Sequence, residues 1–227
     1  ERDLRQSVTE NLASAKTAGT PTAPKALVAP HAGYIYSGPT AAMAYTAIQA
    51  NRDVITRVIL LGPAHRVYVR GLALSSATHF STPLGLVEID QTAVASLKKL
   101  PQVLVSDAAH KQEHSLEVQL PFLQSILDQF TLVPLVVGEA RPAEVAEVLE
   151  LLWGGPETLV VISSDLSHYH DYQTARRIDA ATTHAIENMQ LESIGSEHAC
   201  GCMPLRGLLK VARDHGLRVK TLDTRNS

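Results

Sequence analysis

The stretch Arg57-Val-Ile-Leu-Leu-Gly-Pro-Ala-His65 contains the pattern that decides the fold of this 227-residue chain. It begins with a short apolar run, which is typical of a strand buried on both faces of a sheet. Gly62-Pro63 stops the strand, because proline cannot donate to a sheet and glycine permits the turn. His65 therefore comes just after the end of a buried strand.

Two other apolar runs end in the same way. Lys25-Ala-Leu-Val-Ala-Pro30 precedes His31, and Thr158-Leu-Val-Val-Ile162 precedes Ser163-Ser-Asp165 and His168. In open α/β sheets, ligands bind outside the carboxyl ends of the strands. Three strands that deliver a histidine to the same edge of a sheet predict one shared site there.

The rest of the chain alternates between strand and helix patterns. Further strands are expected at residues 71–75, 85–89, 131–137 and 218–222, and helices at residues 3–16, 39–50, 91–100, 114–128, 142–152, 171–190 and 203–215. Asp90 is placed to cap the helix that starts at residue 91. This alternation predicts an α/β fold with a largely parallel or mixed central sheet and helices on both faces, in a single domain over residues 1–227.

The composition of the chain and the absence of several motifs argue against some classes of function. Twenty Lys+Arg against 23 Asp+Glu give a net charge of −3, and the basic residues are scattered, so neither nucleic acid nor a membrane surface is an expected partner. No apolar run approaches the roughly 18 residues of a membrane-spanning helix. The first residues lack the apolar core of a signal peptide, so a cytoplasmic location is expected. The sequence has no G-x-G-x-x-G, P-loop or G-x-S-x-G motif, which argues against nucleotide binding and a serine hydrolase.

The two cysteines, Cys200 and Cys202, are separated by one residue and are not expected to form a disulfide with each other. They precede a helix that is expected to begin near Pro204, and a thiol at a helix N-terminus has a lowered pKa and binds metals better. A free cysteine is as often a small buried hydrophobe, and the residues alone leave this choice open. Histidine together with thiolate suits zinc, iron or copper rather than magnesium or calcium.

The segment Asp165-Leu-Ser-His168 has two interpretations. Asp165 could cap a helix, or His168 could act as an acid/base beside a metal while Asp165 orients it across a helical turn. The second interpretation is favoured. His110-Lys-Gln-Glu-His114 matches the H-x-x-E-H zinc-protease pattern, but so short a pattern arises by chance in a chain with ten histidines. Glu113 is equally typical of a helix N-terminus.

Five motifs occur in order between about residues 25 and 210. They are Pro30-His-Ala-Gly-Tyr34 with Ser37-Gly38, Leu61-Gly-Pro-Ala-His65, Glu113-His-Ser-Leu-Glu117, Ser163-Ser-Asp165 with His168, and Cys200-Gly201 with Pro204. Together they resemble the Memo family, which in prokaryotes is named AmmeMemoRadiSam system protein B. The resemblance implies a fold similar to that of class III extradiol dioxygenases of the LigB type.

The resemblance also implies roles for individual residues. It makes His31, His65 and Cys200 the metal ligands. His168 takes the place of the dioxygenase acid/base, with Asp165 beside it, so these two are the expected catalytic residues. The expected pocket residues are Tyr34, Glu113, His114 and Ser164.

The chain departs from the family pattern at several points. Ala64 stands where the family usually has Ser or Asn, and Cys202 is an additional thiol. The family's aromatic N-terminal motif and C-terminal Tyr-Ala segment are missing, so the chain is expected to be trimmed at both ends. The dioxygenases have a carboxylate at the position of Cys200. Because a thiolate is softer and more easily oxidised, the similarity of fold does not establish catechol cleavage.

The sequence therefore supports two hypotheses about function. The first is a metal-dependent redox or oxygenase-type enzyme of unknown substrate with one transition-metal ion, for which iron or copper is favoured and zinc is an expected occupant of purified protein. The second is a non-catalytic metal- or peptide-binding adaptor that uses the same pocket. An unknown small molecule or peptide is the expected partner, and the resemblance implies a functional link to a radical-SAM protein and an AMMECR-type protein.

Overall fold

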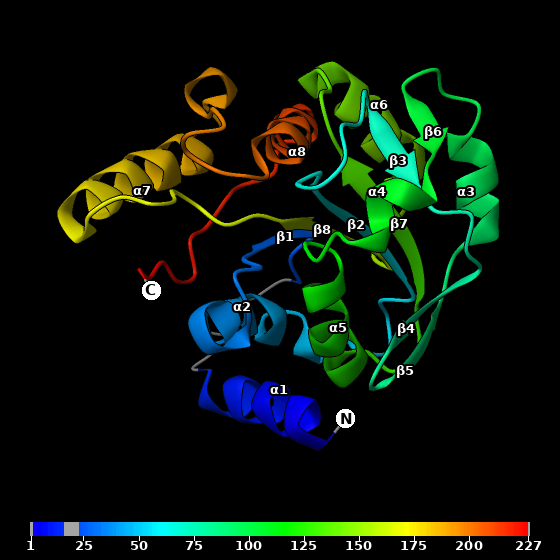
Figure 1. Cartoon of the computed structure of the whole chain (residues 1–227), viewed down its shortest axis with the longest axis horizontal. Helices are drawn as coiled ribbons and strands as arrows, with labels where there is room; N and C mark the ends of the chain where they lie inside the picture. Colours follow the sequence, from blue (N-terminus) through cyan, green and yellow to red (C-terminus); the bar gives the residue numbers. More distant parts are fainter. Residues whose placement is uncertain (1, 16–22, 227) are drawn as a thin grey trace.

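A six-stranded sheet runs through the centre of the computed structural model, which describes residues 2–15 and 23–226 (Figure 1). Its strands lie in the order β1 (Ala26–Ala29), β8 (Thr158–Ser163), β2 (Arg57–Pro63), β7 (Thr131–Val137), β3 (Leu72–Leu74) and β6 (Val103–Val105). Neighbouring strands are parallel except β7 and β3. A separate antiparallel hairpin consists of β4 (His79–Thr82) and β5 (Gly85–Glu88). The predicted α/β fold with a largely parallel, mixed sheet is confirmed.

Helices cover both faces of this sheet (Figure 1). One face carries α3 (Gln91–Leu97), α6 (Pro142–Leu152) and α8 (Cys202–Asp214), and the other carries α2 (Tyr34–Thr46) and α5 (Leu120–Ile126), with α1 (Arg2–Ser14) outside them. The remaining helices are α4 (Asp107–Lys111), α7 (Tyr172–Glu187) and the short 3-10 turns η1 (Gln49–Asn51), η2 (Glu117–Gln119) and η3 (Leu191–Ser193). Of the helices within residues 2–15 and 23–226, none is both long and apolar enough to cross a membrane.

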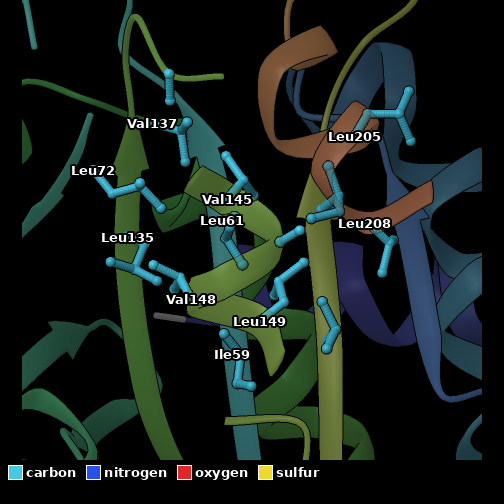
Figure 2. Packing of buried hydrophobic residues seen from close by; sticks show 14 of the residues in the cluster. Ile59, Leu61, Leu72, Leu135, Val137, Val145, Val148, Leu149, Leu205 and Leu208 are labelled. Carbon is cyan, nitrogen blue, oxygen red and sulfur yellow. The ribbon is translucent and has the colours of Figure 1, made fainter. Parts of the chain in front are cut away.

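Strand β2 shows why the sheet needs cover on both faces. Ile59 and Leu61 belong to the apolar cluster under α6 and α8, whereas Val58 and Leu60 belong to the cluster under α2 and α5. All four side chains are 0% exposed, because successive residues of a strand point to opposite faces. Figure 2 shows Ile59 and Leu61 among the leucines and valines of α6 and α8. Burial of each such side chain contributes about 1.5–3 kcal/mol.

Helix α2 begins earlier than the predicted start at Pro39. Gly33 has a φ of +107°, a conformation that other residues rarely adopt, and it lets the chain turn from the end of β1 directly into the helix at Tyr34. Pro39 then lies inside α2 and removes the hydrogen bond to the carbonyl of Ile35. The loss is tolerated because Ile35 lies in the first turn and is 90% exposed, so water reaches it.

The helix predicted over residues 114–128 is shorter in the structure. Residues 112–116 form a loop, η2 follows, and α5 covers only Leu120–Ile126. Pro121 lacks the N–H that would bond to the carbonyl of Glu117, which favours the start of a new helix at this point, with Pro121 in the first turn of α5. The break leaves Glu113 and His114 in a loop, free to approach the edge of the sheet.

The predicted strand at residues 218–222 is wrong. No helix or strand is present between residue 217 and residue 226. The N–H of Thr221 donates to the carboxylate of Glu187 in α7 at 3.1 Å, so this segment runs beside α7 (Figure 1). A strand requires a neighbour to accept and donate its backbone hydrogen bonds, and within the described residues β1 pairs only with β8.

The other predicted elements agree with the structure to within a few residues. Asp90 caps α3, its side chain accepting a hydrogen bond from the N–H of Ala93 at 2.9 Å. The helix predicted at residues 3–16 corresponds to α1, although residue 16 lies outside the described residues. The sequence did not predict β4, β6 and α4, which are only three to five residues long.

Candidate metal centre

The three strands β1, β8 and β2 are neighbours and run parallel, so their carboxyl ends lie side by side. His31 and His65 each come two residues after a strand, β1 and β2 respectively, and Ser164 and Asp165 directly follow β8. Cys200 comes from the loop before α8. The polar residues therefore gather at the edge of the sheet where ligands bind in this class of fold.

The structure brings His31, His65 and Cys200 together. One ligand atom from each lies within 4.8 Å of the other two, and Nε2 of His31 is 3.4 Å from Sγ of Cys200. Around a tetrahedral metal ion with ordinary bond lengths, a nitrogen and a sulfur ligand are about 3.5 Å apart. The three side chains can therefore hold a metal ion with little movement.

His31 is held in one tautomer by a buried hydrogen-bond network. The hydroxyl of Ser163 donates its only proton to the carbonyl of Ser115 at 2.6 Å. The Ser163 oxygen must then accept from Nδ1 of His31 and from Nε2 of Gln119, each at 2.8 Å. Tyr45 fixes Gln119 in turn, by donating to its Oε1 at 2.8 Å. His31 thus carries a proton on Nδ1, and its other nitrogen, Nε2, is the atom that faces Cys200.

His65 is held by the buried carboxylate of Glu113. The backbone N–H of His65 donates to one carboxylate oxygen at 2.7 Å, and Nδ1 donates to the other at 3.0 Å. Burial opposes the charge on Glu113, but the hydrogen bonds from His65 and Ser115 outweigh it and lower the pKa of Glu113 to about 2. Hydrogen bonds to Cys200 and Glu113 raise the pKa of His65 to about 10. A carboxylate behind a ligand histidine in this way orients the ring and makes it a stronger ligand.

The two cysteines have different surroundings. Burial alone would raise the pKa of the Cys200 thiol, but hydrogen bonds from His31 and His65 lower it to about 6. The N–H of Asp165 also points at its sulfur, at 3.3 Å. Cys202 is 3% exposed and packs in the apolar cluster of α8, where burial raises its pKa. Cys200 therefore has the environment of a metal-binding thiolate, and Cys202 that of a small buried hydrophobe.

Gly201 fixes the position of the cysteine loop against β8. Its N–H donates to Oγ of Ser164 at 2.9 Å. A Cβ at this position would lie 2.6 Å from the Cβ of Ser164 and 2.8 Å from the carbonyl oxygen of Ser163, so only glycine allows this approach. Ser164 thus lies beside the sulfur of Cys200, with Oγ 3.9 Å from Sγ.

Asp165 links the ends of β1 and β8. One carboxylate oxygen accepts hydrogen bonds from the N–H groups of His31 and Ala32, at 2.7 and 3.2 Å. The other is 3.7 Å from Nε2 of His31 and 4.0 Å from Nε2 of His168. The predicted helical turn over residues 165–168 is wrong, because this segment has no helical structure and α7 is capped instead by Asp171. His168 nevertheless lies next to Asp165, and with Cys200 they form a second group of candidate ligands.

His114 adds a third imidazole to the cluster. Its ring centre lies 5.6 Å from that of His31 and 5.7 Å from that of His65, and it is about half exposed. His110, the other histidine of the H-x-x-E-H pattern, points elsewhere: its Nε2 is 3.0 Å from the carbonyl oxygen of Ala73, and burial lowers its pKa. The two histidines therefore do not form a joint zinc-protease site.

Tyr34 points away from the metal-ligating atoms. Its hydroxyl donates to the carbonyl of Val118 at 3.0 Å, and its ring packs against Phe122 of α5. In contrast, the sequence analysis missed Tyr45 and Gln119, which hold His31 indirectly. A signal was present, since Gln119 is a polar residue within an apolar stretch and a tyrosine is unusual in the Ala-rich segment of α2.

A cavity of about 980 Å³ adjoins the cluster. Ser164, Asp165 and His168 line the end of it that is next to the candidate ligands, and β1, α2, α7 and residues 217–226 contribute its other walls. Its volume is at the upper end of the range for small-molecule sites. A substrate in this cavity would have direct access to His168.

The chain is similar in sequence to known proteins of one family. The family model described as Memo-like protein matches residues 1–227. The MEMO1 family protein of Aquifex aeolicus (strain VF5) is 39% identical over 176 residues, covering 75% of this chain and 64% of that protein. The MEMO1 family protein of Archaeoglobus fulgidus is 41% identical over 174 residues, covering 74% and 64%. A solved structure, the uncharacterized protein JW3007 from Escherichia coli K12, has a TM-score of 0.46 and 16% identity over 74% of this chain and 81% of that one.

The chain spans about 64% of the length of the Aquifex and Archaeoglobus relatives. A third relative, the MEMO1 family protein of Metallosphaera sedula, is 34% identical over 202 residues, which cover 82% of this chain and 70% of that protein. A family model that matches the whole chain and relatives at this level of identity lead to one conclusion: the chain belongs to the Memo-like protein family.

Proposed function

We propose that this protein is a metal-dependent redox or oxygenase-type enzyme whose single transition-metal ion is bound by His31, His65 and Cys200. The observation that carries the proposal is the convergence of these three donors within 4.8 Å. Each imidazole is already oriented, His31 by Ser163 and His65 by Glu113. Ligand rings that are fixed before binding are typical of metal sites in proteins.

The chemistry of the donors favours iron or copper for turnover and permits zinc. Two imidazoles and a thiolate suit these ions, whereas magnesium and calcium prefer oxygen ligands. A bound iron or copper ion would supply redox chemistry at coordination positions that the three side chains leave open. Three protein ligands with an open position are characteristic of catalytic sites, and four of structural ones.

The residues around the ion would handle the substrate and its proton. His168 lies at the end of the cavity and is 41% exposed, so it can reach both a substrate and solvent. Asp165 lies 4.0 Å from its Nε2 and would hold the ring in a productive orientation. His168 would accept or donate the proton at Nε2. Ser164 and His114 would shape the space beside the thiolate.

A second candidate function is a non-catalytic adaptor that binds a peptide in the same cavity. It is favoured by the exposed tyrosines Tyr36, Tyr169 and Tyr172 in the cavity wall, because exposed aromatic side chains are common at protein interfaces. The functional link to a radical-SAM protein and an AMMECR-type protein, and the cytoplasmic location, stay predictions.

The ligand assignment predicts unequal effects of the two cysteines on metal binding. Cys200→Ser should weaken zinc binding by more than about 100-fold, beyond the effect of removing an outer partner of a ligand. Cys202→Ser should leave zinc affinity nearly unchanged, because Cys202 is buried in an apolar cluster. Competition with a chelating dye measures both affinities. Equal losses would point instead to a Cys-x-Cys chelate.

If His168 transfers protons and does not bind the metal, its removal should lower the activity without lowering the metal content. His168→Ala should retain iron after anaerobic loading but lose oxygen uptake in the presence of substrate candidates. Asp165→Asn should have a milder effect, since an asparagine oxygen still accepts the bonds from the N–H groups of His31 and Ala32. Iron content is measured by mass spectrometry and oxygen uptake with an electrode. If His168→Ala protein cannot hold iron, the site has four protein ligands and the adaptor is the better interpretation.

The low pKa of Cys200 predicts rapid alkylation in chelator-treated protein. The thiolate is the reactive form and is present above the pKa, so the rate with iodoacetamide should rise with pH and reach half its maximum near pH 6. The Cys202→Ser variant isolates this reaction, and the Cys200→Ser variant is the control. Zinc should protect Cys200. A midpoint at the ordinary cysteine value of about 8.5, or no protection by zinc, would contradict the assignment.

A further inference from the structure

The wall of the cavity contains a buried carboxylate, Asp179 of α7, with few partners. Asp179 is 6% exposed, and one of its oxygens accepts a hydrogen bond from the N–H of Ser167 at 3.0 Å. This is the one hydrogen bond to its side chain among the residues that the structure describes, and no described ion pair includes it. The hydroxyl of Ser167 is also buried and has no partner there. Both side chains line the cavity.

Other buried or half-buried carboxylates of this protein show how unusual Asp179 is. Glu113 receives three hydrogen bonds, from two nitrogens of His65 and from the N–H of Ser115. Asp165 receives two from backbone N–H groups. A carboxylate can accept about four bonds, and a charge that is buried without partners is costly. The second oxygen of Asp179 and the hydroxyl of Ser167 are therefore placed to receive a ligand.

Aromatic side chains lie in the wall of the same cavity. Tyr169 and Tyr172 line it and are 103% and 65% exposed, and Tyr169 has a φ of 60°, which is a strained conformation for tyrosine. The guanidinium of Arg176 lies 5.6 Å from the ring centre of Tyr172, so one face of this ring already takes part in a cation–π contact within the protein. Strain at exposed aromatic side chains is typical of functional sites rather than of simple loops.

Four basic residues line the cavity, Lys25, Arg218, Lys220 and Arg225, and none of them forms an ion pair with Asp179 among the described residues. Nζ of Lys25 donates to three backbone carbonyls, including that of Trp153 at 2.5 Å. Arg225 pairs with Asp223 at 2.7 Å. A positively charged ligand could therefore pair with the carboxylate of Asp179.

We propose that Asp179 and Ser167 form a binding subsite for the ammonium group of a small organic amine. The free oxygen of Asp179 accepts one ammonium hydrogen and Oγ of Ser167 accepts another, while the apolar body of the amine lies along Tyr169 and Tyr172. Ser167 directly precedes His168, so the rest of the molecule extends toward Asp165 and the candidate ligands. The identity of this amine as a substrate rests on the proposed function, but its binding does not require the metal.

The test compares Asp179→Asn with Asp171→Asn. Asparagine at position 179 still accepts the hydrogen bond from Ser167 but carries no charge. Asp171 is exposed at the start of the same helix, and asparagine caps a helix as well as aspartate does. Binding is measured by calorimetric titration with three probes of similar size but different charge. They are phenethylamine, which is cationic, 2-phenylethanol, which is neutral, and phenylacetate, which is anionic.

We expect phenethylamine to bind the unsubstituted protein more tightly than the alcohol or the carboxylate. Asp179→Asn should weaken its binding at least about tenfold, the usual effect of losing a hydrogen bond to a charged group, and Asp171→Asn should not change it. Equal binding of the three probes, no binding of the amine, or an equal affinity in Asp179→Asn would overturn the proposal. An unchanged melting temperature in Asp179→Asn separates loss of binding from loss of folding.

A further variant separates this proposal from the metal site. Cys200→Ser should keep the affinity for phenethylamine even though it loses zinc. If the unsubstituted protein binds phenethylamine but binds no metal, the subsite stands and the proposed enzyme fails. If zinc binds as expected but amine binding does not depend on Asp179, the proposed amine subsite is wrong and the proposed metal site is unaffected.

Discussion

Strand β8 pairs with β1 on one side and with β2 on the other, and the candidate site depends on this pairing. The register places Ala29 of β1 opposite Ser163 of β8, and Leu61 of β2 opposite Ile162. Because the three strands are parallel and end at nearly the same level, the residues that follow them meet in a small space. His31, His65 and Asp165 are neighbours for this reason, although up to 134 positions separate them in the chain.

At this edge of the sheet, almost every buried polar group that the structure describes has a hydrogen-bond partner. Tyr45, Gln119 and Ser163 each use their donors and acceptors in the chain of bonds that ends at His31. Such a network is stabilising only when every member is satisfied, and it then specifies one arrangement. It holds the candidate ligand His31 in one orientation, at the cost of burying polar groups that an apolar core would not need. The exposed end of the site, with His168 and the tyrosines, has few such bonds and is where binding of a ligand can change the structure.

Much of this arrangement could be predicted from local patterns. The apolar runs at residues 57–61 and 158–162 predict buried strands, and the histidine or serine residues after them predict a shared edge.

The order of the strands could not be predicted, because pairing of β8 between β1 and β2 depends on contacts between distant segments. The strand predicted at residues 218–222 failed for the same reason, since its pattern fits a strand but no strand in the described part of the chain pairs with it. The resemblance implied that Glu113 is a pocket residue, but its hydrogen bonds to His65 could not be predicted, because they join segments 48 positions apart in the chain. Residue types alone left Cys200 and Cys202 equivalent, and the structure distinguishes them by the hydrogen bonds that Cys200 receives from His31 and His65.

X-ray absorption spectroscopy of the zinc-loaded protein tests the central claim most directly, because it counts the ligands of a bound ion and measures their distances. We expect one sulfur at about 2.3 Å and two imidazole nitrogens at about 2.0–2.1 Å, with the remaining positions taken by lighter atoms of solvent. The sulfur signal should vanish in Cys200→Ser and persist in Cys202→Ser. A spectrum with no sulfur, or with two sulfurs, would contradict the assignment of His31, His65 and Cys200 as the metal ligands.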